Sequence, residues 1–181
     1  METERAWIEQ ALKGDPLAFG KLVRAYERPV YNLTYRMLGD SQSAEDAAQE
    51  TFLRAYTRLS TFQTERKFVN WLLSIASHYC IDLLRRSGRY PQISLDEPLP
   101  PQSLSSEGGQ PDSIVDRKQE REMVRKTLDL LPADYRAAVI LRYWYDMSYD
   151  EIATTTGSTE SAVKSRLHRA RRMMAEQLRG G

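Results

Sequence analysis

The chain has 181 residues and is nearly balanced in charge, with 26 Lys and Arg against 25 Asp and Glu. Its single cysteine, Cys80, excludes an internal disulfide and a multi-cysteine zinc site, and two histidines are too few for a histidine-rich metal cluster. The N-terminus lacks a signal-peptide pattern, and no apolar run approaches the length of a membrane span. We therefore expect a cytoplasmic protein of one or two small domains, with no membrane insertion, metal or cofactor.

Four helices are predicted in the first half of the chain, each bounded by residues that favour helix ends. Asp15 followed by Pro16 is a start signal, and Gly39 is a stop signal. Ser43 with Asp46 has the spacing of a capping box, which predicts the start of the third helix. In chain order, the expected helices cover residues 4–13, 16–38, 44–59 and 67–86.

The third predicted helix has an apolar face and a mixed face. Phe52 belongs to an apolar stripe that recurs at helical spacing and faces the core. An outward leucine among acids and amides indicates a protein-contact surface, although single exposed apolar residues are also normal. The residues of this mixed face are Asp46, Gln49, Glu50, Leu53 and Thr57.

Aromatic residues gather around the start of the fourth predicted helix. Phe62 lies in a polar loop over residues 61–66, and Phe68 and Trp71 follow in the helix. Aromatic rings beside a polar loop can stack on unpaired bases, but Phe68 and Trp71 can equally belong to the core. Phe62 is the better candidate for a base contact, because the residues around it are polar.

Residues 87–115 have the composition of a flexible, acidic linker. They contain prolines 91, 98, 100, 101 and 111, a Gly-Gly pair and several serines, with one arginine against four acids. Such a stretch cannot bury a core. The chain is therefore predicted to be all-α, with two small helical domains, residues 1–86 and 116–181, joined by this linker.

The last quarter of the chain has the pattern of a helix-turn-helix. Ser148 and Glu151 form a capping box, Gly157 lies at a sharp turn, and Ser158 can cap the second helix. An apolar stripe follows at helical spacing, through Val163, Leu167, Ala170 and Met174. A short helix, a glycine-bearing turn and a second helix of this kind suit the DNA major groove.

The face of the second helix opposite that stripe is basic. Arg and Ser side chains at its centre can read base edges, while flanking cations contact phosphates. An amphipathic surface helix with a solvated charged face would share part of this pattern. The candidate DNA-contact residues are Ser161, Lys164, Ser165, Arg166, His168, Arg169 and Arg172.

Two independent sets of motifs resemble bacterial sigma factors. The first set, which resembles sigma domain two, consists of Asp46-x-x-Gln49-Glu50-x-Phe52, Phe68-x-x-Trp71-Leu72 and Asp82-x-x-Arg85-Arg86. The second set, which resembles domain four, consists of Leu131-Pro132, Ser148-Tyr149-x-Glu151 and Val163-Lys164-Ser165-Arg166. Only a linker separates the two sets, as in the extracytoplasmic-function group of sigma factors.

The resemblance implies a transcription initiation factor, not an enzyme. Such a factor binds core RNA polymerase, directs it to promoters by reading the −35 and −10 elements, and aids strand opening. The resemblance also implies a restraining anti-sigma protein and a linker that enters the active-site channel of the polymerase. On the protein side, it implies contacts of the first domain-four helix with the β flap and contacts of the β′ clamp helices with Asp46, Gln49, Glu50 and Leu53.

The resemblance also assigns the DNA contacts. It implies −10 contacts by Phe62, Gln63 and His78, with Trp71 as structural support. His78 can also be an ordinary surface histidine. The resemblance implies −35 contacts by the basic second helix, at Ser161, Lys164, Ser165, Arg166, His168, Arg169 and Arg172.

Three other interpretations stay open from the residues alone. A stand-alone helix-turn-helix regulator predicts a symmetric dimer and palindromic sites, but gives no role to the surface around Glu50. A nucleic-acid enzyme would need a catalytic constellation, and no paired carboxylates or nucleophile-base set is apparent. A purely structural helical adaptor would not need the cationic second helix.

Overall fold

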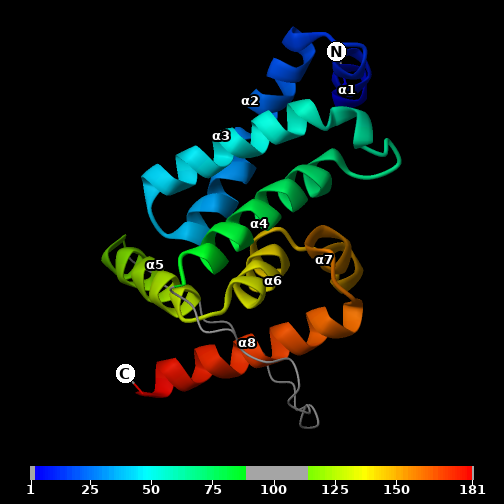
Figure 1. The fold of residues 1–181 in the computed structure, drawn as a ribbon. Coiled ribbons are helices and arrows are strands. Elements are labelled where there is room, and N and C mark those ends of the chain that lie inside the picture. Colours follow the sequence, from blue (N-terminus) through cyan, green and yellow to red (C-terminus); the bar gives the residue numbers. More distant parts are fainter. Residues whose placement is uncertain (1–2, 89–113, 181) are drawn as a thin grey trace.

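The computed structural model describes residues 3–88 and 114–180, and these residues form α-helices joined by short turns (Figure 1). The prediction of an all-α fold in two helical domains is confirmed. Residues 89–113, most of the predicted linker, lie outside the described part of the chain. The elements are α1 (Glu4–Leu12), α2 (Pro16–Leu38), α3 (Ser41–Thr57), the 3-10 turn η1 (Leu59–Thr61), α4 (Phe68–Arg86), α5 (Ile114–Asp129), α6 (Ala133–Trp144), α7 (Tyr149–Thr156) and α8 (Glu160–Gly180).

The first domain is a bundle of α2, α3 and α4, with α1 packed against α2. The Asp15 carboxylate accepts a hydrogen bond from the Leu17 N–H and so caps α2, as predicted. Gly39 ends α2 in the left-handed region, with φ of +84°, where a side chain would be strained. Apolar side chains from all three helices, including Leu33 and Leu72, are fully buried between them.

The predicted start of α3 is wrong by several residues. Asp40 caps this helix, because its carboxylate accepts a hydrogen bond from the Ser43 N–H at 2.8 Å. Ser43 and Asp46 therefore lie inside the helix and form no capping box, and Asp46 accepts from Gln42 instead. The stop at Gly39 and the cap at Asp40 are adjacent, so only these two residues separate the two helices. Leu59, predicted as helical, lies in η1.

The second domain packs α6 against α7 and α8, with α5 along one side. The predicted capping box at the start of α7 is confirmed in both directions, between Ser148 and Glu151. Gly157 makes the turn of the helix-turn-helix with φ of +63°. The predicted cap of the second helix is wrong, because Thr159, not Ser158, accepts a hydrogen bond from the Ala162 N–H.

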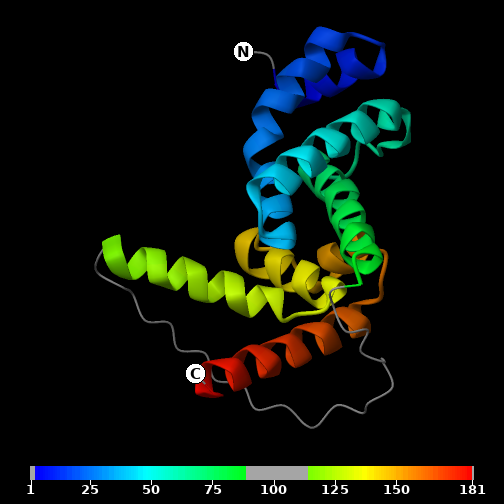
Figure 2. The same cartoon turned by 60° about the vertical axis from the view of Figure 1, so that its left-hand side comes forward.

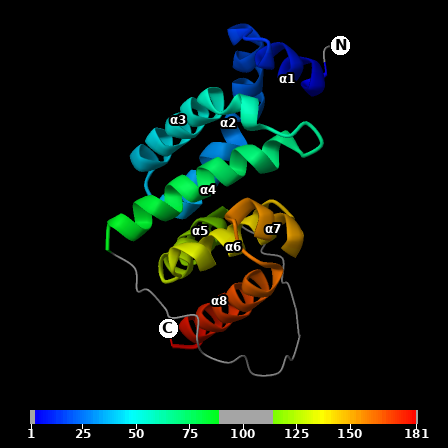
Figure 3. The same cartoon turned by 45° about the vertical axis from the view of Figure 1, so that its right-hand side comes forward.

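The two domains pack directly on each other. Helix α4 lies between α2 and α3 on one side and α6 and α7 on the other, with α8 beyond them (Figure 3). Helix α5 extends away from this stack (Figure 2). Two α4 residues on the side of the helix opposite Phe68, Ser77 and Ile81, are buried at 0% and 4% exposure. Helix α4 is therefore buried on two faces, which the sequence interpretation did not anticipate.

Candidate protein-docking and nucleic-acid surfaces

The mixed face of α3 is open to solvent. Asp46 and Gln49 are exposed, and Leu53 keeps 63% of its surface. The Glu50 carboxylate is held by the Arg54 guanidinium one turn later, at 2.7 Å. Such an exposed pair within one helix adds little stability, so both charges remain available to a partner.

Tyr56 extends this face and was not among the predicted residues. It is 50% exposed, and its ring meets the Phe19 ring edge-on at a centroid distance of 5.0 Å. Tyr56 follows Leu53 by three residues, so the two side chains share one helix face. That spacing was a signal in the sequence, because tyrosine is common in protein interfaces. The α3 face, as we use the term below, comprises Asp46, Gln49, Glu50, Leu53 and Tyr56.

Three aromatic rings form a cluster between the loop before α4 and its first turns. Phe62 lies 5.2 Å from Phe68 and 5.3 Å from Trp71, measured between ring centroids. Phe62 is only 7% exposed, so the argument that its polar neighbours leave it accessible is wrong. Its hydrophobic ring packs on the cluster while the loop around it, including Gln63, stays exposed. The assignment of Phe62 and Gln63 to the −10 element stays a prediction.

His78 and Trp71 lie where α4 approaches the second domain. The His78 Nδ1 atom is 2.8 Å from the Ser74 carbonyl oxygen. Its Nε2 atom comes close to the helix-turn-helix turn, 3.5 Å from where a Cβ on Gly157 would stand. Trp71 is half-buried and lines a cavity shared by the two domains.

The basic face of α8 is positioned by its buried apolar stripe. Val163, Leu167 and Ala170 are almost completely buried, as predicted. Of the candidate DNA-contact residues, Ser161, Lys164 and Arg172 are exposed, and Ser165, Arg166, His168 and Arg169 are half-buried.

Neighbouring side chains hold several of these cations in place. The Lys164 ammonium lies 5.8 Å from the centroid of the Tyr149 ring, at the start of α7. Arg169 donates to the Tyr135 hydroxyl at 3.3 Å, and Arg172 pairs with Glu176. The arrangement places cations, hydroxyls and an imidazole on one helix face, which suits phosphates and base edges.

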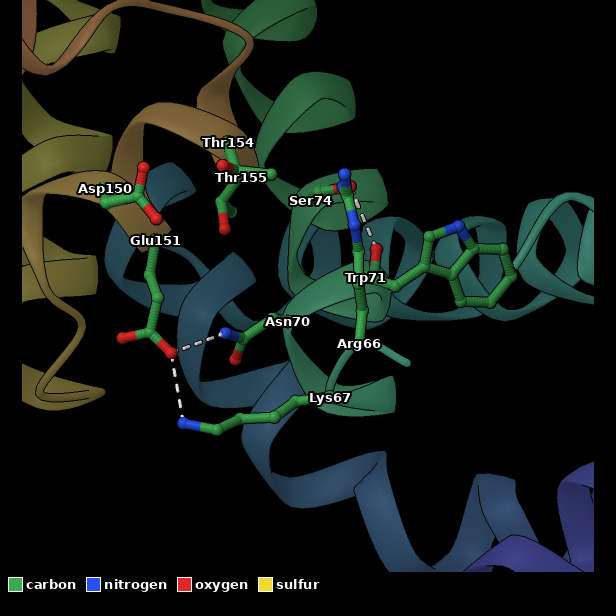
Figure 4. A pocket seen from close by; sticks show the side chains of 9 residues that line it. All are labelled: Arg66, Lys67, Asn70, Trp71, Ser74, Asp150, Glu151, Thr154 and Thr155. Carbon is green, nitrogen blue, oxygen red and sulfur yellow. Dashed lines mark hydrogen bonds and ion pairs between the residues drawn. The ribbon is translucent and has the colours of Figure 1, made fainter. Parts of the chain in front are cut away.

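A cavity of about 320 Å³ lies between α4 and α7 (Figure 4). Cations and amides from the first domain face carboxylates and hydroxyls from the second across it. The Glu151 carboxylate accepts hydrogen bonds from the Lys67 ammonium at 3.0 Å and the Asn70 amide at 3.1 Å. The lining residues are Arg66, Lys67, Asn70, Trp71, Ser74, Asp150, Glu151, Thr154 and Thr155.

Glu151 is the carboxylate whose ionised form the surroundings favour most clearly. The Ser148 backbone N–H and then the Lys67 ammonium hold the pKa of Glu151 at about 2, and Asn70 adds to this effect. Glu151 is therefore ionised throughout the physiological range.

Residues 3–88 and 114–180 contain neither a candidate membrane span nor a candidate metal site. None of their helices combines the length and apolar character needed to cross a bilayer. Their His, Cys, Asp and Glu side chains form no group of three or more suited to a metal ion.

Comparison with known proteins gives a match for each domain. Residues 22–90 match the model of Sigma-70 region 2, and residues 121–174 match that of Sigma-70 region 4. The chain is 36% identical over 179 residues to the ECF RNA polymerase sigma factor SigW of Bacillus subtilis, covering 95% of each protein. The chain belongs to the extracytoplasmic-function sigma factors. It is an alternative sigma factor, which directs RNA polymerase to promoters.

Other relatives and solved structures agree with this family. The ECF RNA polymerase sigma-E factor of Escherichia coli K12 is 32% identical over 174 residues, covering 93% of this chain and 91% of the relative. CnrH, solved with the cytosolic domain of CnrY, superposes with a TM-score of 0.71 at 24% identity and covers 99% of both chains. RpoE of Bartonella quintana, solved with the anti-sigma factor NepR, gives a TM-score of 0.65 at 24% identity, with 89% of this chain and 96% of that chain covered. These two structures share the fold.

Proposed function

We propose that four surfaces of this sigma factor have different roles. The α3 face docks on the β′ clamp helices of core RNA polymerase. Helix α4 and the loop before it, with Gln63, Trp71, His78 and, after release from its cluster, Phe62, hold the −10 element. The basic face of α8 reads the −35 element. Helix α6, which precedes the helix-turn-helix, contacts the β flap.

The observation that carries this proposal is the separation of two chemically different exposed surfaces. The α3 face combines two acids with a leucine that is 63% exposed and a tyrosine that is 50% exposed, which suits a protein partner. The α8 face is dominated by Lys164, Arg169 and Arg172, which suits nucleic acid. One chain that carries both surfaces can bind polymerase and promoter DNA at the same time.

The remaining parts of the proposal concern partners and context. We propose that the factor works in the cytoplasm, catalyses no reaction itself, and is restrained by an anti-sigma protein. The family supports the first two points, and the complex of RpoE with the anti-sigma factor NepR supports the third. We also propose that residues 1–86 and 116–181 act as sigma domains two and four, with residues 87–115 between them.

The test is co-elution of the purified protein with bacterial core RNA polymerase. The double change Asp46→Ala/Glu50→Ala removes both acids of the α3 face, and we expect binding at least about tenfold weaker, or about 1.4 kcal/mol. Glu27→Ala is the matched control, because Glu27 is an exposed acid on α2, outside the α3 face. Equal loss in the control and the double variant would contradict the docking assignment.

A second outcome would overturn the function itself. If the wild-type chain failed to bind core polymerase and instead held duplex DNA as a dimer, it would be a stand-alone regulator. The dimer would be visible as a change in mass by light scattering. Palindromic binding sites would then follow from the symmetry of the dimer.

A further inference from the structure

Two cations on the basic face of α8 contact tyrosines of the two neighbouring helices. Helices α6 and α7 both pack on α8 (Figure 1). Tyr149 is the first residue of α7, and the Lys164 ammonium on α8 lies 5.8 Å from the centroid of its ring. Tyr135 belongs to α6, and its hydroxyl accepts a hydrogen bond from Arg169 at 3.3 Å. Each of the two supporting helices therefore contributes one aromatic side chain to one cation of α8.

The two cations lie on opposite edges of the exposed side of α8. Successive residues of an α-helix are about 100° apart around its axis, so Lys164 and Arg169 are separated by about 140°. Ser165 lies between them on the outer side, and the buried apolar stripe lies on the inner side. The tyrosines therefore restrain cations at both edges of the surface assigned above to the −35 element.

Tyr135 offers Arg169 an acceptor at a fixed position. Its side chain is only 3% exposed, and close packing holds a buried ring of this size in one orientation. A guanidinium carries its N–H donors in one planar fork, so a bond from one of them to a fixed acceptor orients the whole group. The Tyr135 hydroxyl therefore sets the plane in which Arg169 meets the DNA.

Tyr149 is held by contacts on its own side of α8. The capping box described above fixes the start of α7, where this ring lies. The Arg142 guanidinium lies 5.3 Å from the ring centroid and donates to the Met147 carbonyl at 2.8 Å. The ring is thus placed by α6 and α7, and its electron-rich face attracts the Lys164 ammonium.

Holding these side chains in place favours reading bases more than it favours attraction to phosphates. Lysine and arginine have much rotamer freedom to lose when a ligand orders them, so a side chain that is already restrained binds at a lower cost. An arginine reads a guanine through two parallel donors and a lysine reads it as a point donor, and both contacts depend on orientation. Attraction to the phosphate backbone depends mainly on charge and is independent of sequence. Loss of the restraint should therefore lower sequence-specific binding selectively.

We propose that Tyr135 and Tyr149 are positioning residues that hold Arg169 and Lys164 in the orientation that reads the −35 element. The Tyr135 hydroxyl does so for Arg169, and the face of the Tyr149 ring does so for Lys164. The inference rests on the proposed assignment of the basic face of α8 to the −35 element. Each tyrosine acts through its cation and not through a contact of its own with DNA.

The experiment measures DNA binding by holoenzyme that is reconstituted with each variant of the full chain. Fluorescence anisotropy compares two probes: the duplex that wild-type holoenzyme selects from a random-sequence library, and a scrambled duplex of the same length and composition. Tyr135→Phe removes the hydroxyl and keeps the buried ring. Tyr143→Phe is the matched control, because it removes a hydroxyl from a tyrosine of the same helix that is 57% exposed. Thermal unfolding of each variant checks that the fold is retained.

We expect Tyr135→Phe to weaken binding of the selected duplex by about twofold to tenfold, the range for one hydrogen bond, and to leave the scrambled duplex unchanged. Tyr143→Phe should match the wild type on both probes. In an Arg169→Ala background, Tyr135→Phe should cause no further loss, because the hydroxyl acts through that arginine. An equal loss on both duplexes, or an additive loss in the double variant, would overturn the role of Tyr135.

Two substitutions of Tyr149 separate its ring from its hydroxyl. Tyr149→Phe keeps the ring face and should bind both duplexes like the wild type. Tyr149→Leu removes the ring and should weaken the selected duplex by about twofold to fivefold, the range for an exposed cation–π contact. That loss should vanish in a Lys164→Ala background. If Tyr149→Phe cost as much as Tyr149→Leu, the ring face would not be the restraint and the role of Tyr149 would be overturned.

The alanine variants of the two cations separate this inference from the proposed function. If neither Arg169→Ala nor Lys164→Ala weakens binding of the selected duplex, the basic face of α8 does not read the −35 element and both proposals are wrong. If both changes weaken it while Tyr135→Phe and Tyr149→Leu leave it unchanged, the positioning role alone is overturned.

Discussion

Helices α3 and α4 lie side by side in the first domain, yet their outward faces have different surroundings (Figure 3). Along α3, Leu53 and Tyr56 keep half or more of their surface exposed. Along α4, Ser77 and Ile81 are buried and Lys67, Asn70 and Arg85 are engaged by acids of the second domain. One helix presents its proposed partner surface to solvent, and the other has it covered.

This difference implies an order of events. Core polymerase can reach the α3 face without any rearrangement of the free protein. On the proposed assignment of the −10 element to α4, the element can reach this helix only after α6 and α7 have moved away. We infer that polymerase binding precedes −10 recognition, so that the free factor has little access to promoter DNA through its first domain.

The largest expected effect is on the free energy of unfolding. It distinguishes a buried leucine of α4 from an exposed leucine of α3. Leu72 is fully buried, so Leu72→Ala should lower the free energy of unfolding by about 2–5 kcal/mol, through lost burial and a cavity. Leu53→Ala should change it by less than about 0.5 kcal/mol while weakening polymerase binding. Chemical denaturation measures the first quantity and co-elution the second. A strongly destabilised Leu53→Ala would show that the α3 face supports the fold and is not free for docking.

The next effect concerns α8, whose basic face is also open. Lys164→Ala should weaken binding of the −35 element in duplex DNA by about 1–3 kcal/mol and leave polymerase binding unchanged. Arg179→Ala is the matched control, because it removes an exposed cation near the end of the same helix. Fluorescence anisotropy of the holoenzyme on a −35 duplex measures DNA binding of both variants, and co-elution with core polymerase measures polymerase binding. Loss of polymerase binding in Lys164→Ala would contradict the separation of surfaces.

A smaller effect should follow from loosening the contact between α2 and the end of α6, which also joins the two domains. Tyr145→Phe deletes the hydroxyl that donates to the Pro29 carbonyl. The packing of the two domains on each other should lose about 0.5–1.5 kcal/mol of stability. Burial raises the pKa of Tyr145 to about 12, so this hydroxyl stays protonated and keeps donating at neutral pH. Tyr143→Phe is the control, since Tyr143 is 57% exposed. Energy transfer between the domains should fall only in Tyr145→Phe. An equal fall in both variants would show that the Tyr145 hydrogen bond does not hold the domains together.

The smallest expected effect concerns the single cysteine, in α4, which should not react with an alkylating reagent. Burial raises the pKa of Cys80 to about 12, so at pH 8 only about one thiol in ten thousand would be ionised. Iodoacetamide should therefore alkylate the introduced cysteine of Gln177→Cys and spare Cys80 in the folded protein, as measured by intact mass. Rapid alkylation of Cys80 would show that α4 is open to solvent and not packed on both sides.

Local chemistry made much of the fold predictable. The pair Ser148 and Glu151 was identified correctly because a capping box depends on residues three positions apart. The same spacing at Ser43 and Asp46 misled, because Asp40 caps the helix three residues before Ser43. Both capping errors, at α3 and at α8, concern a choice between neighbouring polar residues that spacing cannot resolve.

Burial that depends on residues far apart in the chain was harder to predict from the sequence. Phe62 has polar neighbours in the chain, and only the fold brings Phe68 and Trp71 around it. Glu151 and Lys67 form an ion pair across a separation of 84 residues, so no local sequence pattern predicts it. Ser77 and Ile81 did offer a signal, since they place a small and an apolar side chain on the side of α4 opposite Phe68.

The most direct test of this account is the distance between the domains during assembly. Dyes on Ala25→Cys and Gln177→Cys report it in the free factor, after core polymerase is added, and after single-stranded DNA is added without polymerase. We predict a short distance in the free factor, a large increase with polymerase, and little change with DNA alone. An equally long distance in the free factor and in the holoenzyme would contradict the claim that α4 is covered until polymerase binds.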